Sequence, residues 1–166
     1  MQIPETDTPR LLPDFDVERF VRVQDLKVND GAQETEFERA VRELREGEKR
    51  SDWILFVFPR VSGLGKHINS IFYGIGTMEE ARAFLGHPII GPRLHEATEV
   101  VLNSGEDNLS KLFGNSDEAS RFRSSMTLFS RVCLGTSDEL FLRVIMKFWG
   151  GIMDERTVSS SKRFEI

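Results

Sequence analysis

Cysteine, tyrosine and tryptophan are scarce in this chain of 166 residues, which has one cysteine, one tyrosine and two tryptophans. The single cysteine, Cys133, excludes a disulfide bond within the chain and any metal site built from several cysteines. No apolar run approaches the roughly 18 residues that a membrane-spanning helix needs. The first residues have neither the basic start nor the apolar middle of a signal peptide. We therefore expect a cytoplasmic protein with no membrane segment.

Phenylalanine, by contrast, is abundant, with 13 residues in the chain. Because its side chain has no polar atom that needs a partner, most of these rings are expected in the core. A chain of about 150 residues can bury roughly 70% of its unfolded surface, which is enough for one domain. We expect a single domain over residues 14–158, a flexible tail at 1–13 and a frayed C-terminus at 159–166.

The net charge of −5 argues against general nucleic-acid binding, which requires a strongly positive surface. Charge is nevertheless uneven, because residues 39–66 contain 7 basic and 4 acidic side chains. This local excess around Lys49 and Arg50 has two interpretations. It is either a patch that binds a small anion or a solvent-exposed helix end with the basic side chains that are common there.

Apolar residues recur at helical spacing along most of the chain, as at Phe37, Ala40, Val41 and Leu44. The run 53–58 fits a buried strand or a buried helix, and we favour a helix because no convincing partner strand exists. Helices are expected at about residues 14–28, 37–44, 53–58, 77–85, 94–102, 108–113, 117–133 and 140–148, with a last turn from 154 and a long loop, or a loop with a short helical turn, at 59–76. The pattern predicts an all-α, single compact multi-helix bundle of about 7–9 helices.

Three polar stretches lie in helical or apolar surroundings, where polar groups must be satisfied internally or bind a ligand. In the helix 117–133, a period of 100° per residue places Ser125 with Arg121 toward the apolar face, while Ser124 and Thr127 point elsewhere. A buried serine normally bonds the carbonyl four residues back, and an arginine normally extends to solvent. The alternative is an anion-binding pair that lines a pocket between helices.

The second stretch is Lys49-Arg50-Ser51, before the run that starts at Trp53. If a helix starts at Ser51, its free amides and the two cations form an anion site; otherwise Ser51 is an ordinary cap and the cations face water. Trp53 is a core residue or a stacking surface. The third stretch contains Gly150 and Gly151, which allow close backbone approach or tight helix packing, followed by Asp154 as a cap that bonds Thr157.

Other motifs are incomplete. Residues 62–66 resemble the end of a phosphate-binding loop, but Arg60 stands at its first glycine position and His67 at its last position. His67, His87 and His95 lack the spacing of metal ligands, so no metal site is expected. No serine–histidine arrangement or acid–base pair is indicated, and the sequence identifies neither a cofactor, nor a reaction, nor an oligomeric state.

The chain resembles domain-of-unknown-function family 1810 from about Phe15 to Val158. Supporting residues are Arg19-Phe20, Gln24, Ala40, Glu43-Leu44, Gly47, Lys49-Arg50-Ser51, Trp53, Phe56, Phe58-Pro59, Gly63-Leu64-Gly65, Tyr73-Gly74-Ile75, Glu80-Ala81, His87-Pro88, Gly91-Pro92-Arg93-Leu94, Ser124 to Phe129, Gly150-Gly151, Asp154 and Arg156-Thr157. The family pattern usually has His at Asp52, Trp at Leu55, Gln at Arg60 and Lys at Arg121. If the His or the Gln is chemically required, this member is impaired. The resemblance implies a mostly helical cytosolic domain and no known reaction.

These observations favour a protein that binds a small molecule, with or without enzymatic activity. Its ligand would be anionic or nucleotide-like and would lie in a polar pocket between helices. The candidate binding residues are Lys49, Arg50, Ser51, Trp53, Tyr73, Arg93, Arg121, Ser124, Ser125, Thr127, Gly150, Gly151, Asp154 and Thr157. The alternative is a protein-interaction module without enzymatic activity, in which the same residues serve caps and helix packing. Its contact surface would be an exposed apolar patch or the acidic N-terminal segment.

Overall fold

The computed structural model describes residues 15–163, and in that range the chain forms ten helices and no β-strand. The helices are α2 (Glu18–Gln24), α3 (Glu36–Glu46), α4 (Ile54–Val57), α5 (Ile68–Phe72), α6 (Met78–Gly86), α7 (Ile90–Leu102), α8 (Leu109–Phe113), α9 (Ser116–Val132), α10 (Leu140–Trp149) and α11 (Glu155–Arg163). The all-α prediction is confirmed, with slightly more helices than the seven to nine expected. The tail at 1–13 lies outside the described residues.

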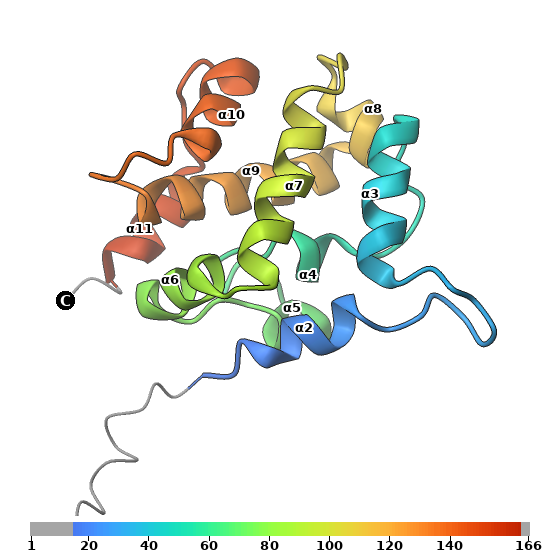
Figure 1. Ribbon diagram of the computed structural model, residues 1–166. Helices are drawn as coiled ribbons and strands as arrows, with labels where there is room; N and C mark the ends of the chain where they lie inside the picture. Colours follow the sequence, from blue (N-terminus) through green and yellow to red (C-terminus); the bar gives the residue numbers. More distant parts are fainter. Residues whose placement is uncertain (1–14, 164–166) are drawn as a thin grey trace, which may run out of the picture.

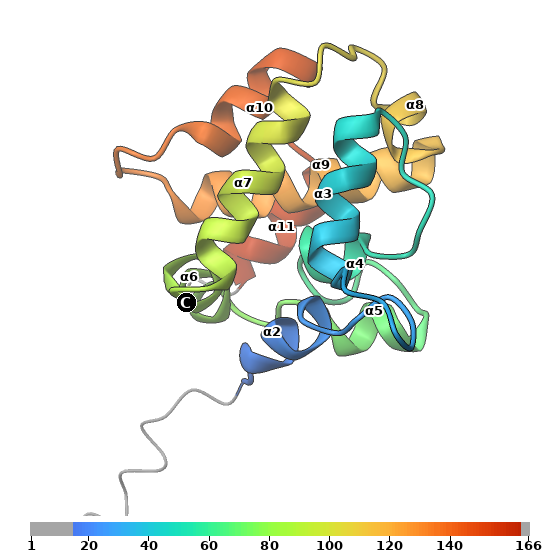
Figure 2. The same cartoon turned by 45° about the vertical axis from the view of Figure 1, so that its right-hand side comes forward.

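Helix α9 runs through the middle of the molecule, as Figures 1 and 2 both show. It contacts α4, α6, α8, α10 and α11, whereas α7 packs against α3, α6 and α10. Every residue from Ser124 to Ser130 is buried, so this part of α9 is enclosed on all sides. A helix surrounded in this way places its polar side chains, as well as its apolar ones, against neighbouring helices.

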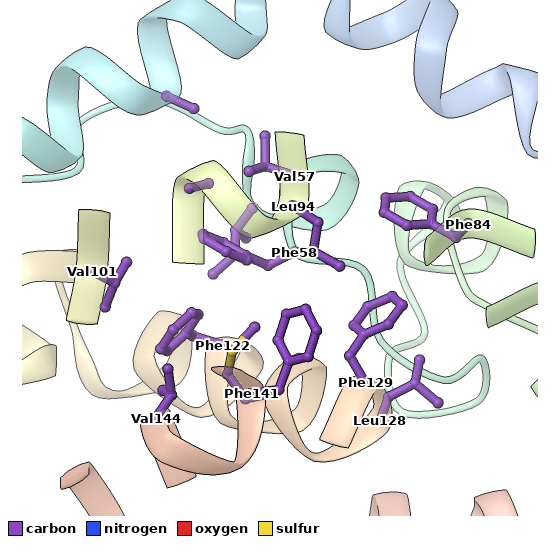
Figure 3. Packing of buried hydrophobic residues seen from close by; sticks show 14 of the residues in the cluster. Val57, Phe58, Phe84, Leu94, Val101, Phe122, Leu128, Phe129, Phe141 and Val144 are labelled. Carbon is purple, nitrogen blue, oxygen red and sulfur yellow. The ribbon is translucent and has the colours of Figure 1, made fainter. Parts of the chain in front are cut away.

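Phenylalanine rings fill the space around α9, as the composition predicts. Phe58, Phe122, Phe129 and Phe141 are at most 1% exposed, and Figure 3 shows them pointing toward one another from α9, α10 and the end of α4. The ring centroids of Phe58 and Phe122 are 4.8 Å apart in an edge-to-face arrangement, which is a favourable geometry for aromatic pairs. These rings join the helices into one hydrophobic core.

Several helix boundaries differ from the sequence-based prediction. Helix α2 ends at Gln24 because the following segment folds back, with the Glu36 amide donating to the Leu26 carbonyl. Helix α9 begins at Ser116, one residue before the predicted start, and is capped by the Asn115 side chain, which accepts from the Glu118 amide. Helix α11 continues beyond residue 159, where fraying was expected. It reaches Arg163, with Ser161 fully buried.

The segment 59–76 contains the short helical turn that the sequence left open, α5. Its two ends run side by side, because Val61 and Ile75 form a parallel bridge. The Arg19 guanidinium of α2 then holds the second end, donating to the carbonyls of Phe72 at 2.8 Å and Gly74 at 3.0 Å. The loop 62–74 is therefore closed at its base, and it carries α5 close to α2 and α4 (Figures 1 and 2).

His95 joins α7 to the connection between α9 and α10. Its Nδ1 lies 3.0 Å from the Gly91 carbonyl oxygen and its Nε2 lies 2.6 Å from the Asp138 carboxylate. Since both partners are acceptors, the ring makes both hydrogen bonds only when both nitrogens carry a proton. Burial lowers the pKa of His95, but the bonds to Asp138 and Gly91 outweigh it, so this pKa lies above its ordinary value.

We expect this pair to make stability pH-dependent. Because the folded-state pKa of His95 is raised, its contribution is fully present below the ordinary value of 6.5 and is lost as the pH rises through the raised pKa. The loss should stay below about 1 kcal/mol, since both side chains are roughly one-third exposed. Chemical denaturation at several pH values measures it. Asp138→Asn should remove most of this slope, and an unchanged slope would contradict the assignment.

Candidate functional site

A cavity of about 420 Å³ lies between α4, α5 and the first turns of α9. Its volume is within the range of roughly 300–1,000 Å³ that is typical of small-molecule pockets. The lining residues are Asp52, Ile54, Leu55, Phe56, His67, Asn69, Ser70, Tyr73, Glu118 and Arg121. Polar and apolar side chains both contribute, which distinguishes this hollow from a packing defect in the core.

Helix α5 turns its polar residues toward the cavity and its apolar residues toward solvent. Asn69 and Ser70 line the cavity, whereas Ile68, Ile71 and Phe72 are 73%, 64% and 52% exposed. A surface helix normally has the opposite polarity, with its apolar side facing the protein. The stability of the free protein does not explain this orientation, but a polar ligand inside the cavity would.

Arg60 lies beside the cavity at Ser70. Its Nη2 and the Ser70 Oγ are both within 3.0 Å of the position that a Cβ would take at Gly65, so a side chain there would displace them. Arg60 is only 9% exposed, and within residues 15–163 its guanidinium has neither a hydrogen bond nor an ion pair. The Ser70 Oγ is also buried without a hydrogen-bond partner. Buried polar groups are normally satisfied, so these two require an explanation.

The charge around Arg60 is also unfavourable to it. Burial, together with the positive charges of Arg121 and Arg156, lowers the pKa of Arg60 to about 10. Asp154 and Glu118 act in the opposite direction without compensating for this effect. Arg60 still carries a full charge at neutral pH, and the free protein therefore maintains a local positive potential that a bound anion would relieve.

The carboxylates of the cavity wall differ in their partners. Glu118 forms an ion pair with the Lys49 ammonium, with 2.9 Å between Nζ and Oε2, and lies 3.9 Å from the Arg121 guanidinium. Asp52, by contrast, is exposed at the cavity mouth and has no ion pair within the described range. The charge of the cavity wall is thus positive near Arg60. It is neutralised at Glu118 by the neighbouring cations, and it is negative at the mouth, where Asp52 lies.

The segment 49–53 is organised by Glu43 and is not an anion site. The Glu43 Oε1 accepts from the amides of Arg50 at 2.8 Å and Ser51 at 3.0 Å and from the Trp53 indole at 2.9 Å. Its Oε2 accepts from the Ser51 hydroxyl at 2.6 Å. The amides and the hydroxyl that we expected to bind an anion therefore already bind a carboxylate of the protein itself. Ser51 does not cap α4, because the N-cap position belongs to Trp53.

The two cations of this segment have partners as well. Lys49 is bound to Glu118, and Arg50 is half exposed and pairs with Glu46 at 2.8 Å. Trp53 is fully buried against Phe58 and Phe113, so the core interpretation of this ring is correct and a stacking surface is wrong. Of the charges and rings expected to gather at one site, Tyr73 and Arg121 alone line the cavity.

The hydroxyl stretch of α9 and the segment after α10 do meet, as expected. Asp154 accepts from the Thr157 amide at 3.0 Å and from the Ser124 hydroxyl at 3.3 Å. Its own amide donates to the Thr127 Oγ1 at 2.9 Å. The network joins α11 to α9. Its link to the cavity region is electrostatic, because the Asp154 carboxylate partly offsets the lowering of the Arg60 pKa.

Helical geometry correctly placed Ser125 inward, but it was wrong to point Ser124 and Thr127 elsewhere, because all three side chains are buried. Ser124 and Thr127 make the specific contacts, and they also donate to the carbonyls four residues back. Ser125 is fully buried, its Oγ has no hydrogen-bond partner, and it does not line the cavity. The error arose because α9 is buried on every side, so that no single face is the inward one.

The remaining expected residues also lie elsewhere. Arg93 pairs with Asp25 at 2.8 Å and donates to the Gln24 side chain, and it does not line the cavity. Gly150 and Gly151 end α10 with φ of 59° and 89°, a backbone conformation that glycine adopts without strain. Nothing lies within 4 Å of a Cβ placed at Gly150, so neither ligand approach nor tight packing explains this glycine.

Sequence reasoning missed Asp52, His67, Asn69, Ser70, Glu118 and, most importantly, Arg60. One signal was available in the departures from the family pattern. Asp52, Leu55 and Arg121 all line the cavity, and Arg60 adjoins it. Four positions scattered over 70 or so residues, at which the resemblance implied a departure from the family pattern, thus gather at one place.

No cluster of three or more potential metal ligands exists among residues 15–163. In the same range no helix has the length and apolar character needed to cross a bilayer. The sole cysteine is buried, and burial raises the pKa of the Cys133 thiol to about 11, which leaves it unreactive at neutral pH. The cavity is therefore the strongest candidate site in the described part of the chain.

Comparison with known proteins identifies the family. The model of DUF1810, a family of proteins of unknown function, matches residues 14–160. The chain belongs to the DUF1810 family. Among curated proteins, none matches it. A similar solved structure is that of the conserved hypothetical protein Rv1873 from Mycobacterium tuberculosis, which is 37% identical. The match covers 90% of this chain and 99% of that one, with a TM-score of 0.78.

Proposed function

We propose that this DUF1810 protein binds a small anionic ligand in the cavity between α4, α5 and α9, and that it does so in the cytoplasm. The observation that carries the proposal is the buried guanidinium of Arg60, which lacks a partner among the described residues. Arg121 on the cavity wall and Ser70 supply a second cation and a hydroxyl. A charged side chain without a partner lowers the stability of the free protein. An anion bound in a cavity of this volume would give that side chain a partner and recover the lost stability.

The alternative function, a protein-interaction module, draws on the exposed apolar residues of α5, Ile68, Ile71 and Phe72. A peptide or protein that covered them would bury apolar surface. This alternative leaves Arg60 unexplained, because the buried guanidinium lies on the other side of α5. The two functions therefore predict different effects of substitutions at Arg60.

Replacing Arg60 by methionine should stabilise the free protein while it abolishes anion binding. Removing an unpaired buried cation in favour of an apolar side chain is expected to raise the free energy of unfolding by about 1–4 kcal/mol. Urea denaturation of the free protein measures this change. Thermal-shift screening against a panel of phosphorylated and carboxylated metabolites should give stabilised complexes for the natural chain and none for Arg60→Met.

Arg93→Met is the matched control. Arg93 is also a partly buried arginine, but it pairs with Asp25 at 2.8 Å and contacts Gln24. Its removal should lower stability and leave every ligand-induced shift unchanged. A loss of stability in Arg60→Met equal to that in Arg93→Met, together with an unresponsive panel, would reject the proposed function.

A further inference from the structure

The lining of the cavity consists of two kinds of surface that lie next to each other. One is polar and positive, with Arg121 and Ser70 in the lining and the Arg60 guanidinium next to Ser70, just outside the lining. The other is apolar and is formed by Leu55, Phe56 and Tyr73; the ring centroids of Phe56 and Tyr73 lie 5.7 Å apart, with the ring planes tilted by 58°. A ligand that uses the whole cavity therefore needs an anionic group joined to a ring or another flat apolar body.

The volume supports a ligand larger than a simple anion. A cavity of about 420 Å³ holds far more than inorganic phosphate or sulfate, and it is within the range of pockets for drug-sized molecules. The partly buried Tyr73 ring and the rest of the apolar wall would remain uncovered with a bare anion. Binding of the anion alone should therefore be weak, because most of the available surface contributes nothing to it.

The distribution of charge selects one anionic group of high charge. Arg121 and Arg156 repel the Arg60 guanidinium, and Asp154 and Glu118 offset this repulsion only in part, so a dianion bound at this point relieves it more than a monoanion does. A chain of phosphates would extend past this point toward the carboxylates of Glu118 and Asp52, which would repel it. Asp52, unpaired at the mouth, instead suits a hydroxyl or amino donor on the ligand.

From these features we infer that the ligand is a ring compound with a single phosphate monoester, such as a nucleoside monophosphate or a sugar phosphate. The phosphate binds at Arg60 and Arg121, the ring lies against Tyr73 and Phe56, and a hydroxyl or amino group faces Asp52. This inference rests on the proposed function and gives it a chemical class. Both guanidinium groups, that of Arg60 and that of Arg121, would donate charge-assisted hydrogen bonds to the phosphate oxygens.

Calorimetric titration of the full chain with five probes tests this inference. The probes are adenosine 5′-monophosphate, adenosine, adenosine 5′-triphosphate, ribose 5-phosphate and citrate. We expect the monophosphate to bind at least tenfold more tightly than adenosine and more tightly than the triphosphate, and ribose 5-phosphate to compete with it. Arg60→Gln and Arg121→Gln should each weaken the monophosphate by about 10–100-fold, and Arg50→Gln should not change it.

Two variants are needed because Arg60 is buried and Arg121 is about one-third exposed, so that Arg121→Gln will fold even where Arg60→Gln does not. Citrate binding that depends on Arg60, without any phosphate monoester binding, would overturn this inference and leave the proposed function standing. Tighter binding of the triphosphate than of the monophosphate would also overturn this inference and leave the proposed function standing. Failure of every anionic probe to show dependence on Arg60 or Arg121 would overturn both.

Discussion

Glu43→Ala is expected to lower the free energy of unfolding by about 3–5 kcal/mol, the cost of leaving several neutral hydrogen-bond donors without their shared acceptor. The Glu43 carboxylate is 3% exposed and accepts four hydrogen bonds from Arg50, Ser51 and Trp53. Without it, the Trp53 indole N–H and two backbone amides lose their acceptor in a region that water enters poorly. Urea denaturation at neutral pH measures the change.

Glu46→Ala on the same helix is the control for this substitution. Glu46 pairs with Arg42 and Arg50 at the surface, and its loss should cost less than about 1 kcal/mol. The Arg121 wall of the cavity should also respond to Glu43→Ala, because Lys49 lies between the Glu43-bound segment and Glu118. Equal costs for the two substitutions would show that the Glu43 network contributes little.

The same network predicts an acid dependence. Burial raises the pKa of Glu43, but the hydrogen bonds from Ser51, Arg50 and Trp53 outweigh it, so the pKa lies below its ordinary value of 4.5. The contribution to stability is then present above about pH 4.5 and is lost as the pH falls through the lowered pKa. Glu43→Gln, which keeps the size of the side chain, should flatten the stability curve in this acidic range.

Glu43 also shows how a sequence can be misread at one position. The basic stretch Lys49-Arg50-Ser51 has the composition of an anion site, and the donors are indeed there. Their acceptor, however, comes from α3, where Glu43 stands beside Leu44 and three residues after Ala40, on the buried side of the helix. A carboxylate at an apolar position of a helix was the available signal, since such a group must find donors nearby.

The fold was predictable where a long run of apolar residues at helical spacing determines the structure. Helices α3, α9 and α10 follow directly from apolar residues at helical spacing, and Gly47 ends α3 in the expected left-handed conformation. The short helices depend on tertiary contacts instead. Helix α5 presents its apolar residues to solvent, so no hydrophobic pattern could place it or show which of its sides faces the cavity.

The site was predictable only in part, because its members come from three separate segments. Arg121 and Tyr73 were identified, whereas Arg60 was not, since an arginine after a proline has no periodic context that indicates burial. The contact of Ser124 and Thr127 with Asp154 was anticipated as a meeting of two stretches. Its role proved to be the attachment of α11, and this attachment places Asp154 near Arg60.

Phe122→Ala should be the most damaging substitution in the apolar core, with an expected loss of about 3–5 kcal/mol in the free energy of unfolding. Phe122 is fully buried on α9, and its ring lies 4.7 Å from that of Phe113 and 4.8 Å from that of Phe58. The alanine variant loses three aromatic contacts at once, because Trp149 also faces this ring at 6.2 Å.

Phe72→Ala makes the same chemical change at an exposed position and serves as its control. Phe72 is 52% exposed on α5, so its removal should change the free energy of unfolding by less than about 1 kcal/mol. The pair also separates stability from function, since Phe122 lies one residue after Arg121. If Phe122→Ala still folds at low temperature but loses anion binding, the core under α9 is what holds Arg121 in the cavity wall. Binding that survives unchanged in the folded variant would show that Arg121 is held by Glu118 alone.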